Sequence, residues 1–351
     1  MCFGNGLWVA GCSTDFWSST GNGIYYSVDG KNWVKSNFPD YGVHCIYYAD
    51  GVWVAGTGGS HGAYYSTDGK TWSQSNITGT SAYSLYNANG YWEVACTNGI
   101  WYSTTGKSWI KSNRTTAVNF VYYANGLWVA GNGDLAGSGM LYSTNGTSWS
   151  TVAPAGTAKL FTCCLNANGL WVLGSSSGIY YSTDGKAWTQ SNITTTEIQD
   201  ICYSNGLWVA STNFNIYYST DGKTWSSISA SGTTNYGIVC ENSVWVCCNS
   251  KTLQYSFDGK TWVKSNITSG GSFYSACNAN GLWVATSFNT GLYYSPTWEP
   301  TIPAGEYMFS AAPGSPALNP TELGNVTLTE TINFISNDEN HSTMTAKHIH
   351  S

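Results

Sequence analysis

Two tryptophan-centred phrases alternate along most of the chain, and this repetition limits the fold more than any other feature. The first reads Asn-Gly-Leu-Trp-Val-Ala, as at residues 5–10, and the second reads Tyr-Tyr-Ser-Thr-Asp-Gly-Lys-Thr-Trp, as at residues 64–72. The first phrase recurs at eight tryptophans from Trp8 to Trp283, about 39 residues apart. One unit of this length cannot bury its own apolar faces, so the repeat indicates a solenoid, a propeller or an array.

Each unit contains the signals of four short strands. Asn-Gly and Asp-Gly pairs separate runs rich in Tyr, Trp, Val and Ile, and such pairs favour tight hairpins because the turn requires positive φ. No segment has a helical stripe of useful length. The Leu-Trp-Val-Ala run is apolar at every position, so both faces of its sheet should be buried, as in radially packed blades. The chain is therefore predicted to be all-β, a β-propeller of four-stranded antiparallel blades.

The number of blades follows from the repeat count. Eight copies of the first phrase favour eight blades. Seven is the alternative, because the first copy lacks most of its leading strand and the last lacks a full closing strand. We expect the ring to occupy residues 1–298 and to be closed by strand sharing between the termini. Residues 299–351 hold five of the eight prolines and no tryptophan, and are predicted to form a short C-terminal β/coil segment, for attachment or as the start of a further domain.

Composition narrows the range of partners. Charged residues make up 9% of the chain, against about 25% in ordinary soluble domains, and the net charge is −6. The sequence contains no basic patch, which argues against nucleic acid, and no segment resembles a membrane span or a signal peptide. The eleven cysteines show no Cys-x-x-Cys spacing. We therefore expect buried free thiols, synthesis in a reducing cytoplasm, and neither a metal nor another cofactor.

The second phrase resembles the Asp-box of sialidase-type propellers, in which Ser, Asp, Gly and Trp stabilise the turn between the third and fourth strands. The match lies at residues 66–72, 182–188, 219–225 and 256–262. The family pattern has one more residue between Asp and Gly, and two units carry Thr105 and Asn145 in place of Asp. The resemblance implies a structural turn role for five aspartates: Asp29, Asp68, Asp184, Asp221 and Asp258.

Residue types exclude the chemistry of that family. Sialidases clamp the substrate carboxylate with three arginines, and this chain contains only Arg114. The acidic residues outside the turns are scattered about one per unit, without the paired spacing that glycoside hydrolysis requires. We therefore expect no catalytic residues and a protein that is not an enzyme, with a polysaccharide depolymerase as the weaker alternative.

The lengths of the connections predict which face of the ring binds a ligand. The turns within both phrases are constant in length. The link from second to third strand varies from 9 to 17 residues, measured from the tryptophan of the first phrase to the first aromatic position of the third strand. Successive connections of a meander alternate between two faces, so the varying links share one face with the blade-to-blade crossings. Loops carry function on a rigid frame, and aromatic rings beside amides and carboxylates suit a sugar. The predicted ligand-binding residues are Asp15, Phe16, Trp17, Tyr41, His61, Asp134, Asn213, Phe214, Phe288 and Asn289.

The continuation Ile-Pro-Ala-Gly-Glu-Tyr-Met-Phe at residues 302–309, together with the Trp-rich repeats, resembles tail-fibre and receptor-binding proteins of bacteriophages or prophages. The resemblance implies a non-catalytic adhesin of the virion tail, made in the bacterial cytoplasm, that binds a host cell-surface glycan or glycoprotein. Its C-terminal segment would join other tail proteins. The alternatives that stay open are a secreted, extracellular lectin and a scaffold propeller that binds protein.

Overall fold

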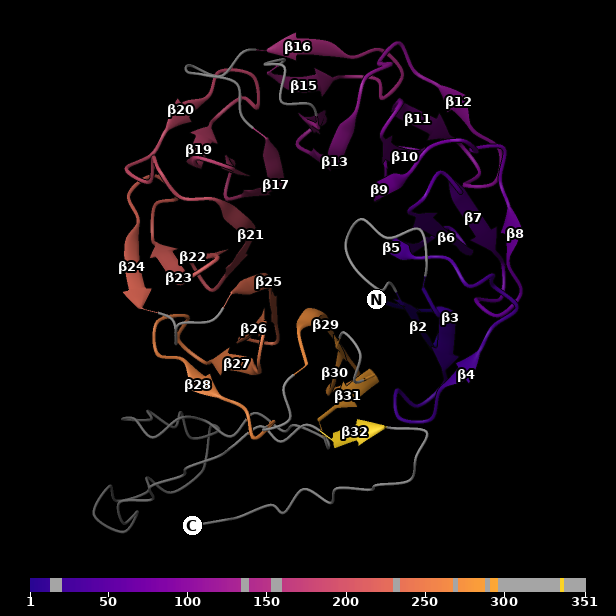
Figure 1. The fold of residues 1–351 in the computed structure, drawn as a ribbon. Helices are drawn as coiled ribbons and strands as arrows, with labels where there is room; N and C mark the ends of the chain where they lie inside the picture. Colours follow the sequence, from indigo (N-terminus) through magenta and orange to yellow (C-terminus); the bar gives the residue numbers. More distant parts are fainter. Residues whose placement is uncertain are drawn as a thin grey trace, which may run out of the picture.

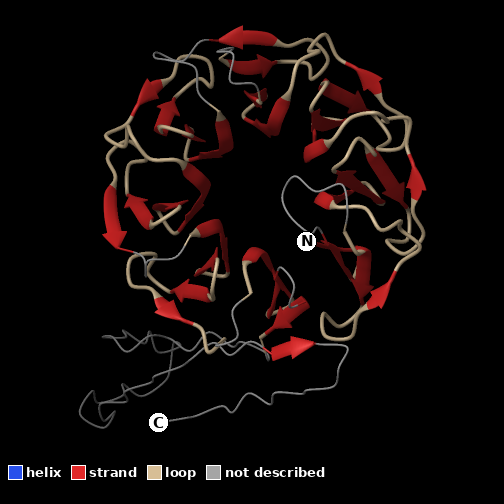
Figure 2. Ribbon diagram, viewed as in Figure 1, coloured by secondary structure: helices blue, strands red, loops and turns tan. Residues whose placement is uncertain are grey.

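The computed structural model describes residues 1–12, 21–133, 139–152, 160–229, 234–267, 271–287, 291–295 and 335–337. These residues form eight four-stranded antiparallel sheets, arranged as the blades of a ring around a central axis (Figures 1 and 2). The prediction of an all-β propeller with eight blades is confirmed. Within the described ranges, no helix has the length and apolar character that crossing a membrane requires.

Each blade is an up-and-down meander whose first strand lies nearest the axis and whose fourth strand lies at the rim (Figure 1). The first strands are β1 (Cys2–Gly4), β5 (Val43–Ala49), β9 (Ala82–Ala88), β13 (Val118–Ala124), β17 (Phe161–Ala167), β21 (Ile198–Ser204), β25 (Asn235–Glu241) and β29 (Phe273–Ala279). The second strands are β2 (Leu7–Cys12), β6 (Val52–Thr57), β10 (Tyr91–Cys96), β14 (Leu127–Asn132), β18 (Leu170–Ser175), β22 (Leu207–Thr212), β26 (Val244–Asn249) and β30 (Leu282–Ser287).

The two outer strands of each blade are shorter. The third strands are β3 (Gly23–Ser27), β7 (Ala63–Ser66), β11 (Gly99–Ser103), β15 (Met140–Ser143), β19 (Gly178–Ser182), β23 (Asn215–Ser219), β27 (Leu253–Ser256) and β31 (Gly291–Tyr294). The fourth strands are β4 (Val34–Lys35), β8 (Ser73–Gln74), β12 (Ile110–Lys111), β16 (Ser150–Val152), β20 (Thr189–Gln190), β24 (Ser226–Ser229), β28 (Val263–Lys264) and β32 (Ile335–Asn337).

The ring closes differently from the expectation of strand sharing between the termini, which was wrong. Strand β1 pairs with β2 in blade 1, and the fourth strand of blade 8 is β32, which pairs with β31. Blades 8 and 1 meet through side chains, with Trp8 packed against Leu282 and Val284. Closure therefore rests on apolar packing between complete blades. The division of the chain at residues 298 and 299 stays a prediction, although β32 from the second part completes the last sheet.

The core consists of eight seams between neighbouring blades. The tryptophan of each second strand is at most 2% exposed, and the residue after it is fully buried in every blade. Each seam joins two blades, as where Leu170 and Val172 of blade 5 pack against Trp208 of blade 6. Because every sheet is covered on both faces, the apolar run of the second strand needs no alternation with polar residues.

We call the face with the first-to-second and third-to-fourth turns the turn face. Its eight inner hairpin turns have positive φ at both central residues, from 48° to 52° at the first and from 65° to 78° at the second. These are type I′ turns, whose twist matches that of the flanking strands. Seven have Gly at the second position, and Ser243 occupies it in blade 7 with φ 65°.

The outer turns of the same face use side chains of the second phrase. In blade 6, Asp221 Oδ1 accepts hydrogen bonds from Ser219 Oγ at 2.9 Å, Lys223 N at 2.8 Å and Thr224 N at 2.7 Å. Trp225 Nε1 donates to the Gly222 carbonyl at 3.2 Å. These bonds hold the pKa of Asp221 below its ordinary value, despite the opposing effect of desolvation. Asn145 reproduces the pattern in blade 4, with its Oδ1 as acceptor.

A repeated asparagine links the rims of successive blades. Asn76 Oδ1 accepts from Trp109 N at 2.8 Å, and Asn76 Nδ2 donates to the Trp109 carbonyl at 2.8 Å. Asn113 and Asn192 bridge to the next blade through the same pair of bonds. The repeated Ser-Asn pair after the fourth strand therefore fixes the spacing of the blades at the rim.

None of the eleven cysteines, all of which lie in described ranges, is bonded to another. Cys247 and Cys248 are buried in different seams, since neighbouring side chains of a strand point to opposite faces of the sheet. Burial raises the pKa of the Cys45 thiol to about 12 and that of Cys240 to about 11. Thiols with such pKa values are poor nucleophiles at neutral pH.

Candidate functional site

We call the face opposite the turn face the loop face, and seven of its blades contain a one-residue β-bulge near the start of the first strand. In blade 6, Ile198 lies opposite Thr212 and Asp200 opposite Ser211, so Gln199 is the extra residue. A bulge re-aims the side chain that it carries. The bulged residues, which we call the bulge ring, are His44, Tyr83, Asn119, Thr162, Gln199, Tyr236 and Tyr274.

Contacts of the bulge ring run from blade to blade. The His44 and Tyr83 rings stack with centroids 5.3 Å apart and planes at 6°. The Tyr236 and Tyr274 rings stack at 4.5 Å and 29°. Thr162 Oγ1 donates to the Ile198 carbonyl of the next blade at 2.7 Å. None of the seven residues is buried. The bulges thus place a circle of partly exposed aromatic, amide and hydroxyl side chains at the inner edge of the loop face, together with His44, whose two ring nitrogens are buried.

Blades 6 to 8 contribute one amide and two aromatic side chains to the bulge ring. Gln199 Nε2 donates to Asn213 Oδ1 at 3.1 Å, which joins the bulge of blade 6 to its second-to-third loop. Phe214, the next residue of that loop, is 65% exposed, and Tyr274 of blade 8 is 39% exposed. Large exposed rings on an uncharged polar surface are typical of binding sites rather than of frames.

The carboxyl group of Asp200 lies between blades 6 and 7, next to the bulge of blade 6. Asp200 Oδ1 accepts from its own-strand Ile201 N at 2.9 Å, and Asp200 Oδ2 accepts from Ile238 N of blade 7 at 3.1 Å. Desolvation raises the pKa of Asp200 to about 6, although the two backbone bonds oppose the shift. Gly237 lies beside this carboxylate, since a Cβ there would make an ordinary contact of 3.6 Å with Asp200 Oδ2 and a tight one of 3.2 Å with the Tyr274 carbonyl.

Four of the ten predicted ligand-binding residues lie in the described ranges, and all four are on the loop face. The rings of Tyr41 and His61 stack at 3.6 Å and 5°, so the structure brings this predicted pair together in blade 2. Asn213 bonds to Gln199, and Phe214 is exposed beside it. Asp15, Phe16, Trp17, Asp134, Phe288 and Asn289 lie outside the described residues.

The bulge ring contains none of the ten residues predicted from the sequence to bind a ligand. The sequence carries a signal for it. The bulged residue lies six positions before the first residue of each inner hairpin turn, and it changes from His to Tyr, Asn, Thr or Gln. The residue before it is apolar in all blades except blade 7, where Asn235 precedes Tyr236. A variable position inside an otherwise repeated strand therefore marks the site.

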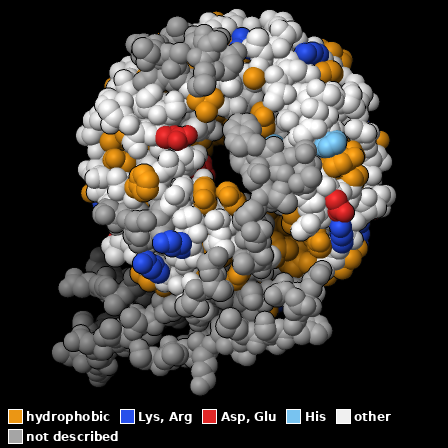
Figure 3. Space-filling view, in the orientation of Figure 1, with side chains coloured by type: hydrophobic (Ala, Val, Ile, Leu, Met, Phe, Trp, Pro, Cys, Tyr) orange, Lys and Arg blue, Asp and Glu red, His pale blue; other side chains and the backbone are white. Residues whose placement is uncertain are grey.

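Charge is sparse around the site. On the face shown in Figure 3 the charged side chains are few and scattered, and the ring is hollowed at its centre. Arg114, the one arginine of the chain, lies in the crossing between blades 3 and 4, where its Nη2 donates to Asn132 Oδ1 at 2.9 Å. Among the described residues, no group of His, Cys, Asp and Glu is arranged to hold a metal ion.

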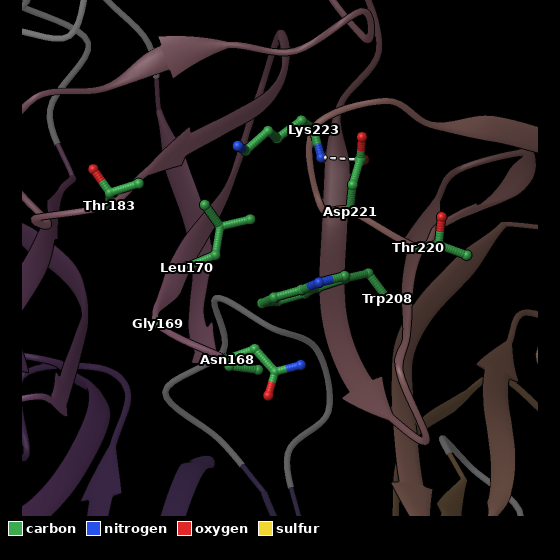
Figure 4. Close-up of a pocket in the computed structure, with 9 residues that line it drawn as sticks. Asn168, Gly169, Leu170, Thr183, Trp208, Thr220, Asp221 and Lys223 are labelled. Atoms are coloured by element: carbon green, nitrogen blue, oxygen red, sulfur yellow. Dashed lines mark hydrogen bonds between the residues drawn. The ribbon is translucent and has the colours of Figure 1, made fainter.

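The turn face also contains a pocket, of about 290 Å³, between blades 5 and 6 (Figure 4). It is bordered by the Asn168–Gly169 hairpin turn, by Trp208 and by Asp221, whose carboxylate accepts from Lys223 N. These are repeat positions of the frame, and the polar group most suited to a ligand is already bonded within its own turn. We therefore assign this pocket to the frame.

Comparison with known proteins supports the fold and leaves the ligand open. No family model and no curated protein sequence matches the chain. A computationally designed protein, Ika8, is similar with a TM-score of 0.67 at 9% identity, over 84% of this chain and 94% of that chain. Virginiamycin B lyase from Staphylococcus aureus, in complex with quinupristin, is similar with a TM-score of 0.60 at 11% identity, over 82% of this chain and 98% of that chain. YCF48 bound to the D1 peptide is similar with a TM-score of 0.56 at 12% identity, over 83% of this chain and 96% of that chain.

These identities are too low to carry a ligand or an activity from one propeller to another. The fold and the site define the chain as an eight-bladed β-propeller, an architecture consistent with a binding scaffold.

Proposed function

We propose that the chain is a non-catalytic recognition module that binds a cell-surface glycan on its loop face. The bulge ring carries this proposal, because it places accessible aromatic rings beside hydrogen-bonding groups on a rigid circle. A sugar ring offers apolar C–H faces and a belt of hydroxyl groups, and such a site suits both. A preformed site also keeps the entropy cost of binding low.

The proposal extends to the setting of the protein. The resemblance of residues 302–309 and of the repeats to phage tail-fibre proteins favours a receptor-binding propeller of a phage or prophage virion. The glycan is then part of the host cell envelope, and the C-terminal segment joins the propeller to other tail proteins. A protein made in the bacterial cytoplasm also accords with eleven unbonded cysteines.

The test is capture of the propeller on bacterial envelope preparations, before and after mild periodate oxidation of vicinal diols. We expect binding to at least one preparation, its loss after periodate, and no release of reducing ends during incubation. Binding that survives periodate but is lost after protease treatment would favour the protein-binding scaffold instead. Release of reducing ends would favour a depolymerase.

A further inference from the structure

The sector of the loop face formed by blades 6 to 8 combines aromatic rings, amides and one carboxylate on three successive blades. Asp200 bonds to the backbone of blade 7, and Gly237 of that blade lies against both the Asp200 carboxylate and the Tyr274 carbonyl of blade 8. Stacking of Tyr236 on Tyr274 continues the contact around the ring. The three blades therefore present one continuous surface.

We propose that this sector is a subsite for one neutral sugar ring, and this inference rests on the function proposed above. The sugar stacks on the exposed aromatic surface, and its hydroxyl groups bond to the amides and the carboxylate. We call it the blade 6–8 subsite, and its residues are Gln199, Asp200, Asn213, Phe214, Tyr236 and Tyr274.

The amides of the subsite are oriented before a ligand arrives. Because Gln199 Nε2 donates to Asn213 Oδ1, Gln199 keeps its Oε1 as an acceptor and Asn213 keeps its Nδ2 as a donor. A pair of neighbouring sugar hydroxyls can donate to the first and accept from the second. Asp200 adds a charged acceptor, and a carboxylate oxygen can accept further bonds beside the backbone N–H groups that it already holds.

A buried hydroxyl supports the assignment independently of the amides. Ser211 lies directly opposite Asp200 in the strand pair, so both side chains leave the same face of the sheet. Ser211 is fully buried, and its Oγ has no hydrogen-bond partner among the described residues. Buried hydroxyl groups normally have a partner. A water molecule beside Asp200 can supply it and can in turn bond to a ligand hydroxyl.

The charges of the sector select the class of sugar. A uronic or sialic acid would bring a second carboxylate toward Asp200, where burial strengthens repulsion between like charges. The guanidinium that could offset it belongs to Arg114, which bonds to Asn132 between blades 3 and 4. Lys251, on the exposed second-to-third loop of blade 7, supplies only a screened point charge. Neutral sugars avoid this repulsion.

The test is an immobilised panel of neutral polysaccharides (dextran, mannan, galactan) and acidic ones (polysialic acid, alginate, hyaluronan), followed by titration of the best probe. We expect a neutral probe to bind best, and Phe214→Ala, Tyr274→Ala and Asp200→Asn each to weaken its binding at least tenfold. Tyr274→Phe should retain binding within about threefold, because the ring is kept. If Tyr274→Ala does not fold, Tyr274→Phe and Phe214→Ala still test the proposal.

Two matched controls locate the effect. Ile110→Ala removes an apolar side chain that is 60% exposed at the rim, close to the 65% of Phe214, and should leave binding unchanged. Val263→Ala removes an apolar side chain that is 45% exposed at the rim of blade 7, and it should also leave binding unchanged. His61→Ala, which removes the stacked pair of blade 2, tests that pair as the alternative location of the site. Loss of binding in His61→Ala with full binding in the three subsite variants would overturn the subsite alone.

The remaining outcomes separate the inference from the function on which it rests. Binding to acidic probes only would overturn the neutral subsite and leave glycan recognition standing. Binding to no polysaccharide of either kind, combined with periodate-resistant capture on envelopes, would overturn both.

Discussion

The two faces of the ring are built from the ends of the same strands, yet they use polar side chains in opposite ways. On the turn face, Asp221 accepts three hydrogen bonds from its own turn. On the loop face, the connections between second and third strands range from two to ten residues, and Phe214 and Tyr274 remain exposed.

This difference shows where sequence repetition serves the frame and where variation is tolerated. Turn-face side chains satisfy backbone groups that are the same in every blade, so one residue type fits all of them. Loop-face side chains at the bulges are less uniform, because the bulge takes the extra residue out of the ladder. Asn119 and Thr162 donate to a carbonyl of the next blade, whereas His44 and Tyr83 stack through their rings. Changes on the two faces should therefore separate, with stability responding to the first and binding to the second.

Glu93 departs from the repeat at a buried position of the frame, and we expect its replacement to have the largest effect on stability. It occupies a fully buried position at which the other seven blades have Val, and neither of its carboxyl oxygens has a hydrogen-bond partner among the described residues. Burial raises the pKa of Glu93 well above its ordinary value. We expect Glu93→Val to raise the free energy of unfolding at pH 7 by about 2 kcal/mol or more, without changing glycan binding.

The pH dependence tests the cause of this effect. Above about pH 4.5 the unfolded chain ionises at Glu93 while the folded chain keeps the proton, so wild-type stability falls as the pH rises. The fall ends once the pH passes the folded pKa. Denaturant titrations at pH 4, 6 and 8 should show the gain from Val growing along this series. A gain of equal size at all three values would mean that packing, not charge, is responsible.

Removing the acceptor of an outer turn should have the next largest effect. Asp221→Ala deletes the partner of Ser219 Oγ, Lys223 N and Thr224 N, and we expect a loss of about 1–2 kcal/mol. Asp221→Asn is the matched control, because Asn145 fills the same role in blade 4, and it should cost less than about 0.5 kcal/mol. Loss of glycan binding in a folded Asp221→Ala protein would show that the turn face takes part in recognition.

Glycan binding should weaken as the pH falls through the pKa of Asp200, which lies at about 6. The ionised carboxylate accepts hydroxyl bonds more strongly than the protonated acid, so affinity for a neutral probe should drop several-fold between pH 7.5 and 5. The titratable groups coupled to Asp200 are thiols, among them Cys163 and Cys248, whose pKa values are raised by burial and which stay protonated in this range. Asp200→Asn should bind weakly at both pH values. An unchanged pH profile in that variant would remove Asp200 from the site.

The smallest effect is expected in the inner hairpin of blade 7. Ser243 has φ 65° at a position where the other seven hairpins have Gly, and it is exposed. Ser243→Gly should raise the free energy of unfolding by roughly 0.5–1 kcal/mol, because the left-handed backbone costs glycine nothing. Thermal melts compared with Ser250→Gly, in a loop of the same blade, would check it. Equal shifts in both variants would mean that the hairpin is not strained.

Much of the frame could be predicted from local patterns. The Asn-Gly pairs specify type I′ hairpins, and the apolar run around each Trp requires cover on both faces of a sheet. The hairpin turn and the tryptophan run recur eight times, with Asp50-Gly51 and Asn242-Ser243 in place of Asn-Gly in two blades, so the blade count followed as well. The closure could not be predicted in this way. Whether β1 or β32 completes blade 8 depends on where distant segments meet, and residues 335–337 lie far outside the repeat.

The candidate site was predicted less completely than the frame. Loop length separated the two faces correctly. The stacked rings of Tyr41 and His61 and the exposed ring of Phe214 all lie on the loop face. Gln199 and Tyr236 were not expected, because a bulge is a property of the register between two strands rather than of one strand's sequence. Asp200 was set aside as a scattered acid, and only its contact with Ile238 of the next blade gives it a place in the site.

By itself, the sequence determined the blade, its turns and the number of copies, because each depends on interactions within about 40 residues. The tertiary structure alone decided which residues of different blades lie together. Gln199, Asp200, Tyr236 and Tyr274 come from three blades, and they are neighbours only because the closed ring brings the bulges of successive first strands side by side. Packing between blades sets that geometry, since the contacts that bring one blade against the next join residues of different repeats.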